Sequence, residues 1–440
     1  MREHISRITS AFALSFSNVA RLVSILLVTV FLGRSLGPSE VGEFSLLLAS
    51  VAVLQSISIG GLSGAAVHKL IVAQDRNLAV HTIVAARLIL IPTFYLFGFV
   101  IATMALSGTD ASIFPIVSFF VGYALGSFDV PEILWMSRGR FHAVAARRTI
   151  LVAILVVPKS IAAMTGNFGL ILLMQGLEAA LWQLVLLRGS GLCRNSILGA
   201  LKNLTAGIRQ VAELRRLWLS SIAAAISTRI DVFIVSALLG SAAVGQYATA
   251  SRFVEAATIL AAAIANVHFN SLVDSQFRAD RYAARSSAAA RSMFLLAAGV
   301  AVGMAVAGPI TVQLLYGSEF AVAAALVPLY SLAIIPIFQR QLLSKHLLIE
   351  KMYGYSLACN ILALIITASA NVGLVPVLGL WGAVIAAISG YTLSLVLAFL
   401  PTRRGRAILR LSFGSIVFKS ASVVPAAECL VLDRKTTAIA

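Results

Sequence analysis

Residues 36–44 read LGPSEVGEF and residues 239–247 read LGSAAVGQY, so one pattern, L-G-x-x-x-V-G-[EQ]-[FY], occurs in each half of a chain of 440 residues. The second residue of each copy is a glycine suited to the tight end of a helix, Gly37 or Gly240. A second glycine, Gly42 or Gly245, permits close backbone approach where the next helix starts. The sequence therefore predicts an internal repeat, with an equivalent helical turn in each half.

Composition places this repeat in a bilayer. The chain is 60% hydrophobic and 12% charged, with a mean hydropathy of +0.96, whereas soluble domains carry about 25% charged residues. A chain of this composition and length is typical of a multi-pass membrane protein. The three cysteines, Cys193, Cys359 and Cys429, are too few and too scattered for a disulfide framework or a metal cluster.

Apolar segments long enough to cross a bilayer, roughly 20 residues each, follow one another along most of the chain. The first of them leads directly into the repeated phrase and is too long for a cleaved signal peptide. The sequence predicts an all-α integral membrane protein with about 12 transmembrane helices. The predicted spans are 8–33, 41–63, 79–105, 112–137, 149–164, 168–187, 217–239, 243–273, 293–315, 321–339, 352–375 and 379–400.

The net charge of +17 is unevenly distributed over the connecting loops. Arg34 is the only basic residue in one set of short loops, whereas the alternate loops and both termini hold most of the 34 lysines and arginines. By the positive-inside rule the basic side is cytoplasmic, and so are both termini. The positive charge therefore indicates topology, and nucleic acid is not expected as a partner.

The two copies of the phrase are separated by six predicted spans, so both turns lie on the outer side and the two halves share one orientation. This predicts two six-helix lobes related by a parallel pseudo-twofold repeat, an architecture typical of transporters that bind substrate between the lobes and rock to expose it. The predicted organisation is an N-terminal lobe (1–187), a basic cytoplasmic inter-lobe linker on the inner leaflet (188–216), a C-terminal lobe (217–400) and a basic cytoplasmic tail (401–440).

Four stretches resemble a known family: FLGRSLGPSEVGEFSLL near the start, STRIDVFIVSALLGSAAVGQYATASRFVE in the middle, LLYGSEF at 314–320 and VLGLWGAVIAA at 377–387. They are similar to the polysaccharide-transporter (Wzx-type flippase) branch of the multidrug/oligosaccharidyl-lipid/polysaccharide exporter superfamily, over about residues 5–400. The resemblance implies that a polyprenyl-pyrophosphate-linked oligosaccharide is moved from the inner to the outer leaflet of a bacterial inner membrane, for surface polysaccharide or O-antigen. Polymerase and chain-length proteins of the same pathway are then expected partners.

Charged residues inside the spans are candidates for the site, because a mid-bilayer charge costs roughly 2.5–3.5 kcal/mol unless protein, water or substrate satisfies it. On the hairpin of the seventh and eighth spans, Arg229 matches Glu255 in depth and Asp231 matches Arg252. Two cross-hairpin ion pairs are predicted. The alternative is that this cluster faces a central cavity, where arginines bind anionic groups bidentately.

Three further basic residues lie within the first half. Arg21 has no acidic residue at its depth on the neighbouring span, so we expect it to face a pyrophosphate, or else to pair with Glu178. Arg87 is expected to pair with Asp129 or Glu132, or to bind substrate, and Lys159 to extend toward the outer surface. The residues predicted to bind substrate are therefore Arg21, Arg87, Arg229, Asp231, Arg252 and Glu255.

No catalytic or metal site is predicted, because the histidines are scattered and the chain has no phosphate loop or nucleophile elbow. No cofactor is expected, although coupling to a proton or sodium gradient through Asp231 or Glu255 stays open. Two alternatives to a flippase remain: a cation-coupled drug antiporter of the same superfamily, which favours an acidic cavity, and a membrane glycan polymerase or ligase. The latter needs a sizeable outer loop, which the short predicted loops do not offer.

Overall fold

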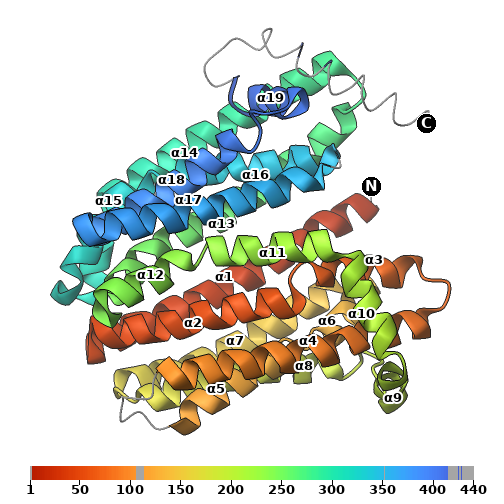
Figure 1. Ribbon diagram of the computed structural model, residues 1–440, viewed down its shortest axis with the longest axis horizontal. Helices are drawn as coiled ribbons and strands as arrows, with labels where there is room; N and C mark the ends of the chain where they lie inside the picture. Colours follow the sequence, from red (N-terminus) through yellow and green to blue (C-terminus); the bar gives the residue numbers. More distant parts are fainter. Residues whose placement is uncertain (1, 106–112, 351, 415–424, 426–427, 429–440) are drawn as a thin grey trace. The chain divides into compact units, whose positions relative to one another are not determined.

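The computed structural model (Figure 1) describes residues 2–105, 113–350, 352–414, 425 and 428, and most side chains from residue 17 onward. All regular structure in this part of the chain is helical. The chain divides into two compact units, Met1–Ala225 and Ile226–Ala440. Each unit is described by itself.

The first unit packs α1 against α7, α5 against α8 and α4 against α2, α9 and α10. The segment expected as a linker forms α9 and α10. The helices of this unit are α1 (Arg2–Leu36), α2 (Pro38–Ile59), α3 (Leu62–Val72), α4 (Arg76–Ala105), α5 (Ile113–Gly126), α6 (Val130–Met136), α7 (Phe141–Met164), α8 (Phe168–Leu187), α9 (Arg194–Lys202), α10 (Leu204–Glu213) and α11 (Arg215–Ser227), whose last residues belong to the second unit.

The second unit packs α17 against α18 and α12, and α13 against α14 and α16. Around the junction of α15 and α16, the apolar side chains of Ala323, Leu326 and Phe338 are fully buried. The helices of this unit are α12 (Ile230–Leu239), α13 (Ser241–Ser275), α14 (Ala279–Tyr316), α15 (Ala321–Ser331), α16 (Ile334–Ile349), α17 (Tyr353–Leu378), α18 (Leu380–Leu397) and α19 (Arg403–Leu409), with the short turns η1 (Ser318–Phe320) and η2 (Arg410–Gly414).

The predicted spans agree with the helices. Ten helical stretches in the searched part of the chain are long and apolar enough to cross a membrane, and eleven if the bent pair α15–α16 counts as one. The third predicted span coincides with α4, whose last side chains lie outside the described residues. Each of the twelve predicted spans thus corresponds to a helix or to a broken pair of helices.

The repeated phrase has the same backbone conformation in both units. Gly37 has φ 90° and ψ −171°, and Gly240 has φ 83° and ψ −180°. Each amide donates to the carbonyl four residues earlier, at 3.1 Å, and each glycine joins two helices. This region of φ and ψ is essentially restricted to glycine, which explains why the phrase keeps a glycine at this position in both halves.

We expect Gly240→Ala to destabilise the protein by about 1–3 kcal/mol, because alanine must adopt this conformation. A Cβ at Gly240 would meet no atom within 4 Å, so the cost comes from the backbone alone. Gly299→Ala is the matched control: a Cβ there also meets nothing within 4 Å, but the residue lies inside α14 with ordinary helical φ. Thermal unfolding in detergent measures both, and equal melting temperatures would contradict the expectation.

The second predicted span contains a break near its end, at residues 60–61 between α2 and α3, and three other predicted spans are broken farther from their ends. α5 and α6 are separated at residues 127–129, α11 and α12 at 228–229, and α15 and α16 meet at a bend of 49°. The first and third of these breaks fall in the fourth and tenth predicted spans, which are equivalent positions of the two halves. Interrupted spans at equivalent positions are a pointer to the binding region of a transporter.

Candidate functional site

A buried polar cluster joins α1, α7 and α8 in the first unit. Lys159 is 0% exposed and its Nζ forms an ion pair with the Glu178 carboxylate. The same ammonium group donates to Ser24 Oγ at 3.1 Å and to Gln175 Oε1 at 3.3 Å, and Gln175 donates to Tyr123 Oη at 3.0 Å. The expectation that Lys159 extends to the outer surface is wrong, because this residue has a complete set of buried partners.

Arg21 lies one turn before Ser24 on α1 and is exposed. Glu178 was predicted as an alternative partner of Arg21, but it pairs with Lys159 instead. Among the side chains that the structure describes, no hydrogen bond or ion pair is formed by Arg21. It lies within electrostatic range of Tyr123 and Arg148. Arg21 is therefore a cation available to an anion from outside the unit.

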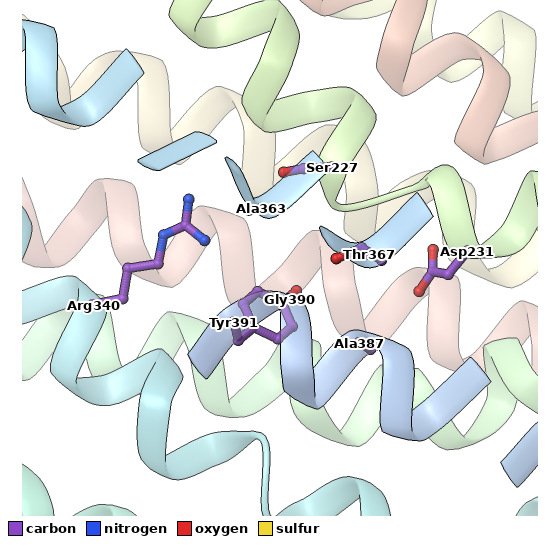
Figure 2. Close-up of a pocket in the computed structure, with 8 residues that line it drawn as sticks. All are labelled: Ser227, Asp231, Arg340, Ala363, Thr367, Ala387, Gly390 and Tyr391. Atoms are coloured by element: carbon purple, nitrogen blue, oxygen red, sulfur yellow. The ribbon is translucent and has the colours of Figure 1, made fainter. Parts of the chain in front are cut away.

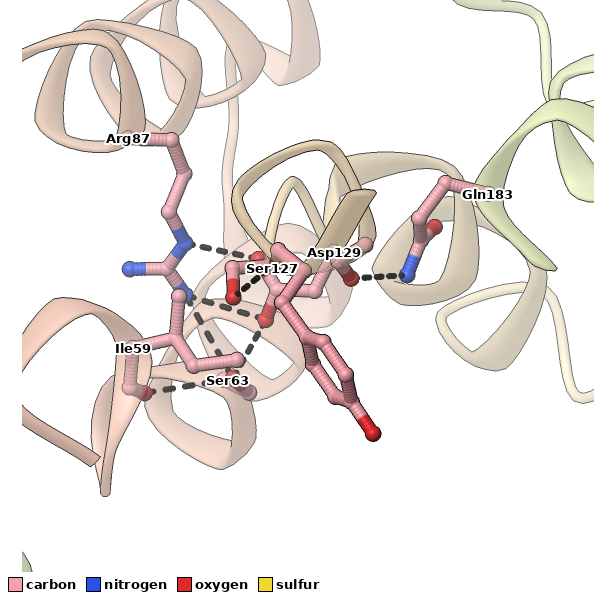
Figure 3. Close-up of polar contacts among 8 residues, drawn as sticks. Ile59, Ser63, Arg87, Ser127, Asp129 and Gln183 are labelled. Atoms are coloured by element: carbon pink, nitrogen blue, oxygen red, sulfur yellow. Dashed lines mark hydrogen bonds and ion pairs between the residues drawn. The ribbon is translucent and has the colours of Figure 1, made fainter. Parts of the chain in front are cut away.

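Arg87 has the partner that the sequence left undecided. Its Nε donates to Asp129 Oδ1 at 2.6 Å, and its guanidinium also donates to Asp129 Oδ2 at 3.2 Å (Figure 3). Ser63 donates to the same carboxylate. The bidentate pair connects α4 to the break between α5 and α6. Because Arg87 is only 2% exposed, this contact favours a structural role for Arg87.

Glu132, the other candidate partner, belongs to a different cluster. Its carboxylate accepts from Trp182 Nε1 at 3.0 Å and lies 3.6 Å from the Arg148 guanidinium. Arg148 also covers the Trp182 ring, with Cζ 4.3 Å from the centroid. No pattern in the sequence indicates this arrangement, because Trp182 and Arg148 lie near the ends of predicted spans and belong to no motif.

In the second unit, the predicted pair of Arg229 and Glu255 is present, with 2.6 Å between Nη1 and Oε1. Both side chains are about one-third exposed, at 34% and 30%. Arg229 lies at the start of α12, at the break in the span. The pair thus joins α12 to α13 close to where the backbone is interrupted.

The predicted pair of Asp231 and Arg252 is replaced by other contacts of Asp231. The Asp231 carboxylate accepts a hydrogen bond from Tyr247 Oη and another from the backbone amide of Val232 at 2.8 Å. Tyr247 in turn shares a hydrogen bond of 2.9 Å with Tyr330 Oη. Arg252 is half-buried on α13. The equal depth of Asp231 and Arg252 therefore did not identify the partner of Asp231, because the Asp231 carboxylate contacts the buried Tyr247.

Asp231 also lines a hollow of about 250 Å³ in the second unit (Figure 2). Arg340 lies at its other end and donates to Asn360 Oδ1. The lining residues are Ser227, Asp231, Arg340, Ala363, Thr367, Ala387, Gly390 and Tyr391. The hollow thus combines a buried carboxylate with several hydroxyl groups.

This arrangement can neutralise a small cation or hold a proton. A carboxylate taken out of water must be paired, hydrogen-bonded or protonated, and Asp231, 6% exposed, has only uncharged donors among its described hydrogen bonds. The described residues contain no group of three or more His, Cys, Asp or Glu side chains that could hold a metal ion. A transition-metal centre is not indicated in that part of the chain.

Solved structures with the same fold are membrane transporters. The chain is similar to the lipid II flippase MurJ in an inward closed conformation, with a TM-score of 0.70, 11% identity and 98% of each chain covered. It is also similar to a MATE family multidrug resistance transporter of the MOP superfamily. The inward-facing form of that transporter gives a TM-score of 0.65 at 15% identity over 89% of this chain and 94% of the other, and the outward-facing form gives 0.65 at 16% over 92% and 95%.

These similarities define the class as a helical membrane protein with the fold of MurJ and MATE transporters. The sequence then identifies the family: a model described as polysaccharide biosynthesis protein matches residues 31–325, and the chain belongs to that family. No curated protein matches the chain by sequence. The family resemblance found in the sequence is thereby confirmed.

Proposed function

We propose that this protein is a flippase that moves polyprenyl-pyrophosphate-linked oligosaccharide units across the bacterial inner membrane by alternating access. Membership of a polysaccharide biosynthesis family supports the pathway, and the fold is one that transporters use. The observation that carries the proposal is Arg21, an exposed cation within a predicted span that has no described partner in its own unit. A lipid-linked pyrophosphate supplies the anion that such an arginine binds bidentately.

The proposed roles of the site residues follow from their contacts. Arg21 is proposed to bind the anionic head group in the first unit. In the second unit, Arg252 and the Arg229–Glu255 pair are proposed to contact substrate. Arg87 is assigned to the structure of the first unit because Asp129 occupies its guanidinium. We propose that the two compact units are the two lobes of an alternating-access transporter.

The protein is proposed to have no enzymatic activity, to span the inner membrane many times and to keep both termini in the cytoplasm. Its proposed partners are the lipid-linked oligosaccharide, membrane lipids, and the polymerase and chain-length proteins of the same pathway. The arrangement of basic loops supports this topology.

The Asp231 hollow is proposed to couple transport to a proton or sodium gradient. Asp231→Asn removes the charge but keeps a carbonyl oxygen that can accept from the Val232 amide and gains an NH2 group that can donate to Tyr247 Oη, so we expect the protein to fold and to lose most gradient-driven transport. Asp274→Asn, at an exposed position of α13, is the control with the same change in charge. Transport by reconstituted protein with and without each ion gradient provides the measurement, and an unchanged gradient dependence would remove Asp231 from this role.

A cation-coupled drug antiporter is the second candidate, because MATE transporters share the fold. The test uses purified protein in liposomes, with a fluorescent lipid-linked oligosaccharide in one arm and an organic cation dye in the other. Arrival of the oligosaccharide in the opposite leaflet, measured by its accessibility to an external lectin, is the expected result. Transport of the dye without movement of the oligosaccharide would overturn the flippase proposal.

A further inference from the structure

Five arginines gather at one end of the first unit. They lie at the start of α4, in the turn between α6 and α7, early in α7 and just after α8. We call this group the arginine corner; its members are Arg76, Arg138, Arg140, Arg147 and Arg188. The turn at Gly166, which lies beside Leu36, marks the other end of α7.

Two members of the arginine corner lie over the ring of Trp135, which is near the end of α6. The Cζ atom of Arg147 lies 4.1 Å from the Trp135 ring centroid, and that of Arg140 lies 5.4 Å from it. The indole is 5% exposed and its Nε1 donates to the Leu186 carbonyl at 2.9 Å. A guanidinium stacked on a fixed ring is held in place and keeps its edge free for further hydrogen bonds.

Neutral groups accept hydrogen bonds from two other members, Arg138 and Arg76, and from Arg147 as well. Arg138 donates to the Gly189 carbonyl at 3.1 Å, and Arg76 donates to Ser137 Oγ at 2.9 Å. Arg147 donates to the Arg188 carbonyl at 3.3 Å. These bonds fix the side chains but leave their charge unbalanced.

No carboxylate pairs with a member of the arginine corner among the described residues. Partial burial and the guanidinium groups of Arg76 and Arg140 lower the pKa of Arg138. The adjacent Asp75 accepts from the backbone amides of Asn77 and Leu78. Gathering like charges is unfavourable, so an anion from outside the chain would stabilise this group.

Exposed apolar side chains lie close in sequence to two members of the arginine corner, Arg76 and Arg188. Ile71 and Val72 are each 63% exposed, Leu78 is 50% exposed and Leu187 is 42% exposed. Apolar and basic residues exposed side by side are typical of the boundary between the bilayer and water. This position favours the head group of a lipid over a soluble anion.

We propose that the arginine corner binds the phosphate group of an anionic membrane lipid. Arg138, Arg140 and Arg147 would donate paired hydrogen bonds to the phosphate oxygens, while Ile71 and Val72 contact the acyl chains. This site lies in the first unit alone and is separate from Arg21. It does not depend on the proposed substrate, because the readout below is lipid binding rather than transport.

The test uses full-length protein in a neutral detergent and measures its melting temperature. The added probes are phosphatidylglycerol, phosphatidylcholine or inorganic phosphate. We expect phosphatidylglycerol to raise the melting temperature most, and the triple variant R138Q/R140Q/R147Q to lose at least half of that rise. The control R278Q/R281Q/R403Q removes the same charge from exposed positions of the second unit and should keep the rise.

Two further measurements keep the result interpretable. The melting temperature without lipid shows whether each variant folds, and native mass spectrometry counts the phosphatidylglycerol molecules that stay bound. Arg147→Lys keeps the charge but loses the stacked fork, so partial binding is expected. A full rise in the triple glutamine variant, an equal loss in the control, or an equal rise with inorganic phosphate would each overturn the proposal.

Discussion

Arg21→Ala is expected to abolish export of the lipid-linked substrate while the protein still inserts and accumulates normally. The reason is that Arg21 is exposed and forms no hydrogen bond or ion pair among the side chains described, so its removal breaks no contact of the fold. What it removes is an arginine at a depth where charge is costly unless water or an anion satisfies it. Complementation of a deletion strain, with surface polysaccharide and membrane protein level measured together, tests this.

Arg21→Lys is the conservative variant and should keep partial export, because lysine retains the charge but not the planar fork. Arg34→Ala, at an exposed position in the last turn of the same helix, is the control and should leave export unchanged. Full export by Arg21→Ala would show that the substrate does not need this residue.

Lys159→Ala, unlike Arg21→Ala, is expected to cause a large loss of stability. Lys159 is 0% exposed and pairs with Glu178, and removing one partner of a buried ion pair costs about 3–5 kcal/mol. Arg209→Ala is the matched control: it breaks an exposed pair with Glu213, whose side chains are 81% and 64% exposed. Such pairs contribute little, and thermal unfolding in detergent compares the two losses.

The double variant Lys159→Met/Glu178→Gln distinguishes the contribution of the ion pair from that of the other contacts of Lys159. It removes both charges together, so it should recover much of the stability lost in Lys159→Ala. Stability as low as in the single variant would indicate that the contacts of Lys159 with Ser24 and Gln175 matter more than the ion pair.

The helices could be predicted because hydropathy and turn chemistry are properties of consecutive residues. All twelve predicted spans correspond to helices or broken pairs, and Gly37 and Gly240 share the backbone conformation that their repeat indicated. The breaks were not predicted. Freed backbone groups at a break are satisfied by residues distant in sequence, such as Gln183, which donates to the Gly126 carbonyl at 3.2 Å.

The partners of the charges were only partly predictable. Distance from a turn gives the depth of a residue, and this was sufficient for Arg229 and Glu255. Depth does not give the direction in which a side chain leaves its helix. The pairing of Asp231 with Arg252 was therefore predicted wrongly, and Asp231 contacts Tyr247.

The sequence by itself therefore determined the membrane class, the helical spans and the repeated turn, because these depend on local composition and backbone conformation. Only the tertiary structure decided which charges are buried and which are available. Lys159 and Glu178 lie at unequal distances from the turn between α7 and α8, yet the long lysine side chain brings them together. That contact occupies Glu178, and Arg21 stays exposed. The sequence could not show this, because the rotation of each helix about its axis is set by packing against its neighbours.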